Sequence, residues 1–439
     1  MGGPGGGGGG QGGGSEDQIK PQVFGEDKKA DYGPDYTYQR IRFHKKDEIN
    51  PYAEMQDERY GLDPRTKKIL GLLLFTIVVL FIVMIMPTNI FGVGRDASPA
   101  QLLKEIRSAA MGVLTLFSGG ESQYTTYALT IVVTAFAGAA LALSGGVYQG
   151  AMKNALASPS TLGVMQGGSL GIIIYIVLFY TGDVWAGKTS EYQAYLDSLS
   201  AWEYFGETFG MYLCGLLGCT IVVAIVMALA YIAGHGKVSN VSLVVAGQVF
   251  ASVASMAIQW IRYYITMTSD DETLIALLEE TQSASFEGAY TGAAVLTFVV
   301  PLSICMIIIF AMSSKLSLLA FDEDEARSMG ISTRATRIGM VAVCTVMTAL
   351  VVSFCGAIGF VGFMVPHIAR RIVGADFRYL LPCCAMVGAM LVSVVYFCTQ
   401  LGLAYVPSNS TGFYTSIIGC LMFLFMALRQ RGSSRGEWI

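Results

Sequence analysis

Charged residues are scarce in this chain of 439 residues, and histidine is scarcer still. Asp, Glu, Lys and Arg together make up 14% of the sequence, three residues are histidines, and 53% are hydrophobic. This balance is typical of a polytopic membrane protein rather than a soluble enzyme. The three histidines lie far apart in the sequence, which argues against a polytopic membrane enzyme with a His, Asp or Glu cluster. The formal net charge of −4 argues against a nucleic-acid partner.

Motifs that hold nucleotides or metals are also missing. The nearest match to a phosphate-binding loop, His235-Gly236-Lys237, lacks the glycine that GxxxxGK[ST] requires five residues before Gly236. The nine cysteines all fall within apolar stretches and form no CxxC motif, which favours buried free thiols over disulfides. We therefore expect no metal and no cofactor in this chain. If the protein moves a solute uphill, another polypeptide supplies the energy.

The first 66 residues have no sustained apolar period, and they do not resemble a signal peptide. They open with GGPGGGGGGQGGGS, which is typical of a flexible chain, and continue as a polar segment with many basic residues. We expect residues 1–66 to form a disordered cytoplasmic tail. Residues 67–430 are then the membrane domain, and residues 431–439 are a short cytoplasmic tail.

Ten apolar stretches follow, most of them close to the ~20 residues that a bilayer requires. Short loops rich in Lys and Arg stay in the cytoplasm, and most basic residues fall in the tails and the even-numbered loops. Both termini are therefore expected in the cytoplasm. The expected spans are 69–86, 125–148, 163–181, 208–234, 241–266, 291–313, 338–357, 358–372 (short and Gly-rich), 380–404 and 412–428.

The middles of these spans lack Asp, Glu, Lys and Arg, apart from Arg262 near the end of its span. Proton- or ion-coupled transporters usually carry carboxylates or histidines within the membrane to bind the driving ion. Their absence argues against a secondary transporter. The expected fold class is an all-α polytopic membrane protein with about ten transmembrane helices.

The cytoplasmic loop 316–337 (LSLLAFDEDEARSMGISTRATR) has the pattern of two short helices. Its carboxylates complement the dipole at the start of the first helix, and Gly330 fits the left-handed stop position. Ser332 or Thr333 then caps a second short helix. This pattern predicts a rigid knob for a partner, although an ordinary acidic loop fits the spacing equally well. The contact residues expected are Asp322, Glu323, Glu325, Ala326, Arg327, Met329 and Gly330.

Small residues recur every four positions in the span 241–266. Gly247, Ala251 and Ser255 form a stripe that lets two helices approach closely. The neighbouring helix can belong to a second subunit or to the same chain. Gln248 lies beside the stripe and is the candidate for a polar side chain that faces a translocation path.

Several blocks, in order along the chain, resemble the FecCD family, the permease subunits of ABC importers for iron–siderophores, heme and cobalamin. Residues 138–149 match GAALAxSGxxxQ, residues 154–163 resemble NPLAxPxxLG, and residues 356–382 match GxIGFxGLxxPHxxR followed by DxRxLLP. The loop 316–337 resembles ALG(D/E)xxAxxLG. Together the blocks span roughly residues 69–430. The motif residues carried over are Asn154, Pro159, Gly163, Gly359, Gly362, Pro366, His367 and Arg370.

The resemblance implies a type II ABC importer permease in the bacterial inner membrane. Its implied partners are a second permease subunit, two cytoplasmic ATPase subunits that bind ATP and Mg, and an extracytoplasmic substrate-binding protein. The loop 316–337 would enter a cleft of the ATPase, and 241–266 would line the path between the permease subunits. The implied solute is an iron–siderophore chelate, with heme or cobalamin as the alternative. The cytoplasmic gate would consist of Ser239, Asn240 and Val241.

Two further expectations concern single residues. His367 is a lone histidine on the cytoplasmic side, which favours a structural hydrogen bond over a heme or iron ligand. At the outer end of span two, residues 127–130 (YALT) stand where the family carries an Arg-Leu-Pro-Arg anchor for the binding protein. Lys104 and Arg107 are one turn apart in an amphipathic outer stretch, and we expect the binding protein to dock there.

Overall fold

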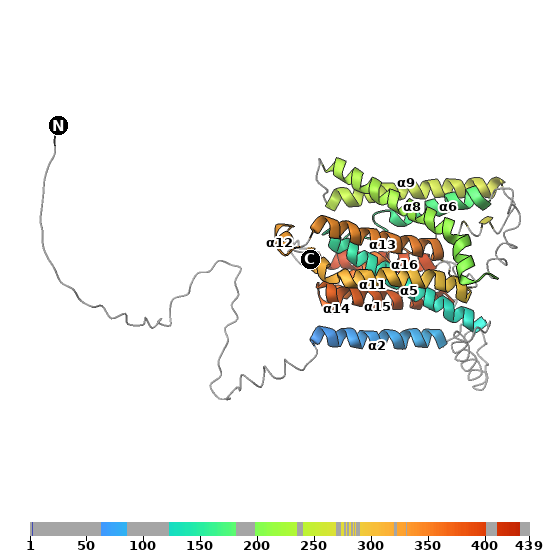
Figure 1. Ribbon diagram of the computed structural model, residues 1–439, viewed down its shortest axis with the longest axis horizontal. Helices are drawn as coiled ribbons and strands as arrows, with labels where there is room; N and C mark the ends of the chain where they lie inside the picture. Colours follow the sequence, from blue (N-terminus) through green and yellow to red (C-terminus); the bar gives the residue numbers. More distant parts are fainter. Residues whose placement is uncertain are drawn as a thin grey trace, which may run out of the picture. The chain divides into compact units, whose positions relative to one another are not determined.

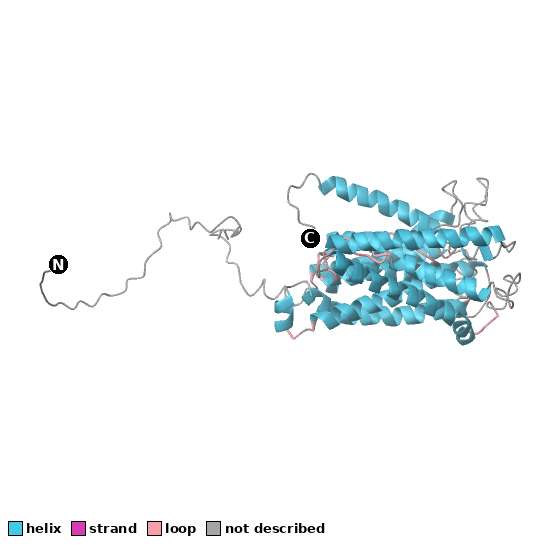
Figure 2. Cartoon of the chain, turned by 90° about the horizontal axis from the view of Figure 1, so that it is seen from above, coloured by secondary structure: helices cyan, strands magenta, loops and turns pink. Residues whose placement is uncertain are grey.

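All regular structure that the described residues contain is α-helical (Figures 1 and 2). The computed structural model describes residues 63–85, 123–180, 198–234, 240–268, 290–319, 323–330, 332–400 and 411–430, together with Gly2 and a few residues between 274 and 286. The helices are α2 (Pro64–Ile85), α5 (Gln123–Ala151), α6 (Val164–Tyr180), α8 (Ala201–Ala233), α9 (Asn240–Thr268), α11 (Gly292–Leu319), α12 (Glu323–Ser328), α13 (Thr333–Cys355), α14 (Val361–Val373), α15 (Phe377–Gln400) and α16 (Thr411–Gln430).

Each of the ten expected spans corresponds to a helix, which confirms an all-α polytopic fold. Seven helices of the described part are long and apolar enough to cross a membrane, namely α2, α5, α8, α9, α11, α13 and α15. Two shorter apolar helices, α6 and α16, accompany them. The remaining one, α14, has 13 residues. It is therefore about 20 Å long, less than the ~30 Å of a bilayer core.

The expected span 358–372 is wrong at its start. Residues 356–360 are not helical, because Gly356 has a φ of 79° and Phe360 has a φ of 62°. Left-handed dihedrals of this kind interrupt a right-handed helix. The chain therefore crosses part of the membrane depth as an irregular segment before α14 begins at Val361. Such backbone is tolerated within a membrane protein where other helices surround it.

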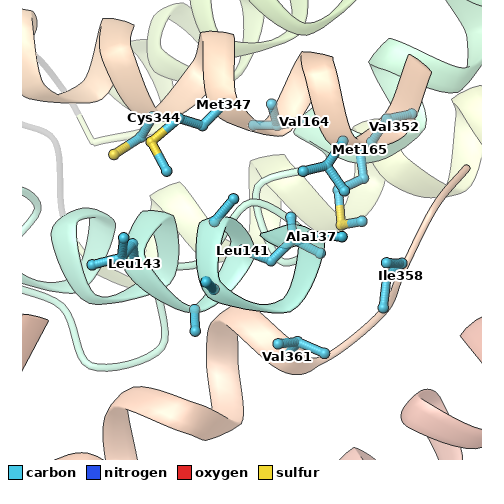
Figure 3. Packing of buried hydrophobic residues seen from close by; sticks show 14 of the residues in the cluster. Ala137, Leu141, Leu143, Val164, Met165, Cys344, Met347, Val352, Ile358 and Val361 are labelled. Atoms are coloured by element: carbon cyan, nitrogen blue, oxygen red, sulfur yellow. The ribbon is translucent and has the colours of Figure 1, made fainter. Parts of the chain in front are cut away.

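The central helix of the bundle is α5, which packs against α2, α11, α13, α14 and α15. Its inner face carries small and aliphatic side chains that are almost completely buried, including Ala137 and Leu141. Figure 3 shows these side chains facing Cys344 and Met347 of α13, with Met165 of α6 close by. This packing brings together helices that are far apart in the sequence.

Two glycine pairs allow α5 to approach its neighbours closely. A Cβ atom at Gly138 would overlap the carbonyl group of Gly388 in α15, and one at Gly145 would overlap the backbone of Gly362 in α14. Backbone-to-backbone packing of this kind is typical of helices in membranes, where small residues permit van der Waals contact. The Gly-rich blocks of the sequence are therefore the contact surfaces of the bundle.

The nine cysteines are all free. Five are buried, as expected, but Cys398 and Cys420 are exposed on the apolar helices α15 and α16. An apolar span does not bury every side chain, because lipid can cover the face that other helices leave open. Among the described residues, no group of three His, Cys, Asp or Glu side chains could hold a metal ion.

Candidate transport path and coupling surface

A polar network fixes α14 against the C-terminal end of α5. Arg370 donates through Nη1 to Oε1 of Gln149 at 2.6 Å, and Gln149 donates through Nε2 to the carbonyl oxygen of Phe363 at 3.3 Å. Gln149 is 3% exposed. Hydrogen bonds to a charged donor are stronger than neutral ones, and the buried Gln149 side chain would lose its partners if α14 moved. The network therefore fixes how α14 is rotated against α5.

A second contact joins α14 to the turn after α5. Nε2 of His367 lies 3.1 Å from the carbonyl oxygen of Ala155, so the histidine makes the structural hydrogen bond that its isolation predicts. The turn is shaped by Asn154, whose Oδ1 accepts from the backbone N–H of Leu156 at 2.9 Å. Side chains of Asn are suited to such turns because they bond to backbone two residues on. Pro159 lies close to Gly362 of α14.

The turn before α6 contacts α9 directly. Gly163 has a φ of 70°, and a Cβ there would lie 3.1 Å from the carbonyl oxygen of Gly247. A Cβ at Gly247 would in turn lie 2.8 Å from Cα of Leu162. Ala251, one turn further along α9, is only 8% exposed. Gly247 and Ala251 thus allow close packing within this chain.

This geometry corrects part of the expected subunit interface. The small residues Gly247 and Ala251 do not lie on the free face of α9, because the turn before α6 covers them. Ser255 is half-buried, and Gln248, which directly follows Gly247, is exposed. A stripe of small residues indicates close approach of backbone, but it does not tell which backbone approaches.

The exposed face of α9 mixes apolar and polar side chains. α9 packs mainly against α6 and α8 and leaves the other side uncovered. Val249 and Met256 are 56% and 73% exposed, and the polar residues Gln248 and Ser252 are exposed next to them. The Ser252 hydroxyl donates to the Gln248 carbonyl oxygen at 2.9 Å. Gln248 lies about 12 Å along α9 from the start of the helix at Asn240. At that position a side-chain amide would be unfavourable against lipid tails. This face is therefore suited to a water-filled path or to a second subunit.

The acidic loop forms a short helix outside the membrane bundle. α12 lies at the same end of the bundle as the start of α2, beyond the ends of α11 and α13 (Figure 1). Ala326 is completely buried and holds α12 to the bundle, whereas Glu325 and Met329 are exposed. Gly330 ends the helix with a φ of 80°, as the stop pattern predicts.

The prediction of a second, separate short helix in this loop is wrong. α13 runs without a break from Thr333 to Cys355, with Ser332 at its N-cap position. The sequence between Thr333 and the apolar span, TRATR, contains no Gly or Pro to interrupt the helix. The knob is thus one short helix and the exposed first turns of a long one.

A contact that the sequence analysis did not anticipate ties this surface to the rest of the bundle. The hydroxyl of Ser317, near the end of α11, donates to Oδ1 of Asp376 at 3.0 Å. The same oxygen accepts from the backbone N–H of Arg378 and so begins α15. The pattern DxRxLLP contains this Asp, but no sequence rule pairs it with a residue 59 positions earlier.

Some expected site residues fall outside the described part of the chain. These include the docking pair Lys104 and Arg107, the gate residue Ser239, and Asp322 of the acidic loop. The structure gives the backbone but not the side chains of the gate residues Asn240 and Val241 and of the loop residues Glu323 and Arg327. Gly359 is described, and it lies beside Ser416 of α16. Of the N-terminal tail, only Gly2 and the residues from Asp63 onward are described.

A bundle of membrane-length helices, with glycine-packed interiors and a short helix presented outside it, defines a polytopic membrane protein of the permease type. The model of one family matches residues 69–429. The chain belongs to the FecCD transport family.

Curated relatives are similar over most of their length. The iron-uptake system permease protein FeuC of Bacillus subtilis is 27% identical over 69% of this chain and 82% of its own. The vitamin B12 import system permease protein BtuC of Klebsiella pneumoniae is 28% identical over 67% and 78%. The hemin transport system permease protein HmuU of Yersinia pestis is 27% identical over 70% and 83%.

A solved structure of an ABC transporter in an inward-facing conformation has the same fold. Its TM-score is 0.58 at 24% identity, and the likeness covers 83% of this chain and 99% of the solved one. The fold expected from the sequence is therefore confirmed.

Proposed function

We propose that this chain is the permease subunit of an ABC importer for an iron–siderophore-type chelate. The observation that carries the proposal is the pairing of two surfaces on one bundle. One is the exposed face of α9 with Gln248, and the other is α12 at the cytoplasmic end. A path for a polar solute needs a polar face such as that of α9. A separate subunit that supplies the energy needs a contact surface outside the membrane, such as α12. The family match supports both assignments.

The other subunits of the proposed importer would be separate chains. A second permease subunit would complete the path along α9, and two cytoplasmic ATPase subunits with ATP and Mg would receive α12. An extracytoplasmic binding protein would deliver the solute. The three relatives FeuC, BtuC and HmuU are bacterial, which supports a bacterial inner membrane as the location. This chain would then do no covalent chemistry. FeuC, BtuC and HmuU are similar to this chain to nearly the same extent, so hemin and vitamin B12 are the alternative solutes.

The described contacts suggest how a force at α12 reaches the path. α12 follows α11, and α11 is hydrogen-bonded through Ser317 to Asp376 at the start of α15. α14 directly precedes α15, and α14 contacts the turn after α5 through His367. The same turn ends at Gly163 against Gly247 of α9. A displacement of α12 by an ATPase would thus be transmitted through packed helices and hydrogen bonds to α9.

Uptake by the reconstituted importer tests the proposal. With its ATPase and binding-protein partners in proteoliposomes, the wild type is expected to accumulate a ferric siderophore only when ATP and Mg are present. Hemin and cyanocobalamin are the competing substrates in parallel assays. Accumulation of hemin or cyanocobalamin alone would replace the proposed solute, and ATP-independent uptake would contradict the class of transporter.

The position of the path is tested by thiol labelling. Gln248→Cys is expected to react with a water-soluble maleimide and to lose most uptake once labelled, because the adduct narrows the path. Only Cys398, Cys420 and the half-buried Cys214 and Cys305 need replacement by serine, since the other five native thiols are buried. Val300→Cys, at a 51% exposed position on α11, is the control. Equal labelling of the Gln248→Cys and Val300→Cys variants would place the path elsewhere. So would full uptake by the labelled Gln248→Cys variant.

Docking of the binding protein is expected to depend on Lys104 and Arg107. The double variant Lys104→Glu/Arg107→Glu should slow association by about tenfold at low salt, because exposed interface charges act mainly on the association rate. The measurement is association rate against ionic strength. Curves that coincide with those of the wild type would show that the anchor lies elsewhere on the outer face.

A further inference from the structure

Five basic side chains gather where α2 meets the turn between α14 and α15. Arg65, Lys67 and Lys68 lie in the first turns of α2, Arg371 lies in the last turn of α14, and Arg378 lies in the first turn of α15. All five are exposed. We call this set the α2 basic patch. It lies at the same end of the bundle as α12 (Figure 1), the end that the distribution of Lys and Arg assigns to the cytoplasm.

Three contacts show that the segments meet. Nζ of Lys68 donates to the carbonyl oxygen of Ile372 at 3.2 Å, directly beside Arg371. The hydroxyl of Tyr379 donates to Oδ2 of Asp63 at 2.8 Å, and the guanidinium of Arg65 lies 5.9 Å from the centre of the Tyr379 ring. Arg65 and Lys68 therefore lie against the segment that carries Arg371 and Arg378, although the two parts are more than 300 positions apart in the chain.

The two carboxylates of this region offset only part of the positive charge of the patch, because five cations lie near two anions. Asp63 accepts from the backbone N–H of Arg65 and from Tyr379, and Asp376 accepts from the Ser317 hydroxyl and a backbone N–H. Among the residues that the structure describes, none of the five basic side chains forms an ion pair with a carboxylate. Five cations thus face two carboxylates whose oxygens are already bonded to neutral donors.

The start of α2 adds a second reason to expect an anion. Asp63 directly precedes α2 and accepts through Oδ1 from the backbone N–H of Arg65, so one carboxylate already lies at the positive end of the helix dipole, beside three basic side chains in the first turns. Cations at this end of a helix are unfavourable, and a bound anion would relieve the repulsion. Asp63 offsets only one of the three positive charges in the first turns of α2, so a bound anion would stabilise this end of the helix further.

The surface next to the patch is apolar and uncovered. One turn along α2, a Cβ at Gly71 would meet no atom within 4 Å, while Leu70 and Leu74 are 56% and 66% exposed. An apolar surface that continues from a cationic one, at the depth of the headgroups, fits a molecule with a phosphate head and acyl chains. A free anion would use the patch but not the surface of α2.

We propose that the α2 basic patch is a binding site for an anionic phospholipid of the cytoplasmic leaflet, whose phosphate lies between α2 and the α14–α15 turn. The bound lipid would bridge α2 to the residues beside Asp376. Since Asp376 is also bonded to Ser317 of α11, the lipid would stabilise the end of the bundle that presents α12. Basic clusters between membrane helices on the cytoplasmic side are known to hold such headgroups.

The test compares two pairs of charge removals in the full-length protein. Lys67 and Arg371 make no side-chain contact among the described residues, so Lys67→Gln/Arg371→Gln should leave the fold unchanged. Lys315→Gln/Arg334→Gln removes two exposed charges from α11 and α13, outside the three segments that form the patch, and is the matched control. Binding of cardiolipin and of phosphatidylcholine is measured by native mass spectrometry of the detergent-purified protein, with the melting temperature recorded for each.

The patch variant is expected to bind cardiolipin about tenfold more weakly than the wild type, and the control variant should bind as the wild type does. Cardiolipin should also raise the melting temperature of the wild type and the control but not of the patch variant. Equal binding of cardiolipin and phosphatidylcholine would show ordinary annular lipid and overturn the proposal. So would equal weakening in both variants, or displacement of cardiolipin by inorganic phosphate at equal concentration.

Discussion

Gly330→Val is expected to reduce ATP-driven uptake by at least about tenfold while the membrane bundle stays folded. Gly330 ends α12 with a φ of 80°, a region that a β-branched residue adopts only at considerable cost. A Cβ at this position would meet no atom within 4 Å, so the effect arises from the backbone conformation and not from a clash. α12 has only six residues, and a cost of about 1–2 kcal/mol is enough to unfold so short a helix.

The matched control is Gly330→Asn, because asparagine tolerates the left-handed conformation. It should retain most uptake and most binding of the ATPase subunits. Uptake is measured in proteoliposomes, and ATPase binding is measured by co-purification. If the valine variant assembles and transports normally, α12 has no role in coupling to the ATPase. The loop 316–337 would then be an ordinary acidic connection, which is the alternative that the sequence leaves open.

The helices could be predicted from the sequence because each carries its own signal. An apolar stretch of membrane length must satisfy its backbone hydrogen bonds within itself, so length and composition suffice to place α2, α5, α11 and α15. The prediction of a helix failed at residues 356–360, because the conformation there is not determined by the local sequence alone. The stretch is apolar and Gly-rich like a span, but the left-handed dihedral at Phe360, a residue that rarely adopts it, depends on the surrounding helices.

The candidate site was predicted less completely, because its contacts join distant parts of the chain. The sequence identifies Gly247 and Ala251 as small and Gln248 as polar, but only the fold shows that the turn before α6 covers the two small residues. The pairing of Arg370 with Gln149 is of the same kind, since it joins residues 221 positions apart. Periodicity within one helix predicts which side chains share a face of that helix. It does not predict which neighbouring segment packs against that face.

Gly145→Ala is expected to destabilise the bundle and to abolish most uptake. Its Cβ would overlap the carbonyl group and Cα of Gly362, and backbone atoms cannot rotate away as a side chain can. α14 would have to move outward. Overpacking of this kind costs about 1–3 kcal/mol. The displacement also acts on the Arg370–Gln149 hydrogen bond, because Gln149 lies one turn beyond Gly145 on the same helix.

Gly339→Ala in α13 and Gly71→Ala in α2 are the matched controls. A Cβ at either position would meet no atom within 4 Å. Because alanine is the better helix former by about 1 kcal/mol, both controls should be as stable as the wild type or slightly more so. The sign of the change therefore separates close packing from helix propensity. The measurement is the melting temperature of the purified protein, with uptake as the second readout. A Gly145→Ala variant that melts with the controls would show that α5 and α14 have room to separate, and the close approach of their backbones would then not be what holds α14 in place.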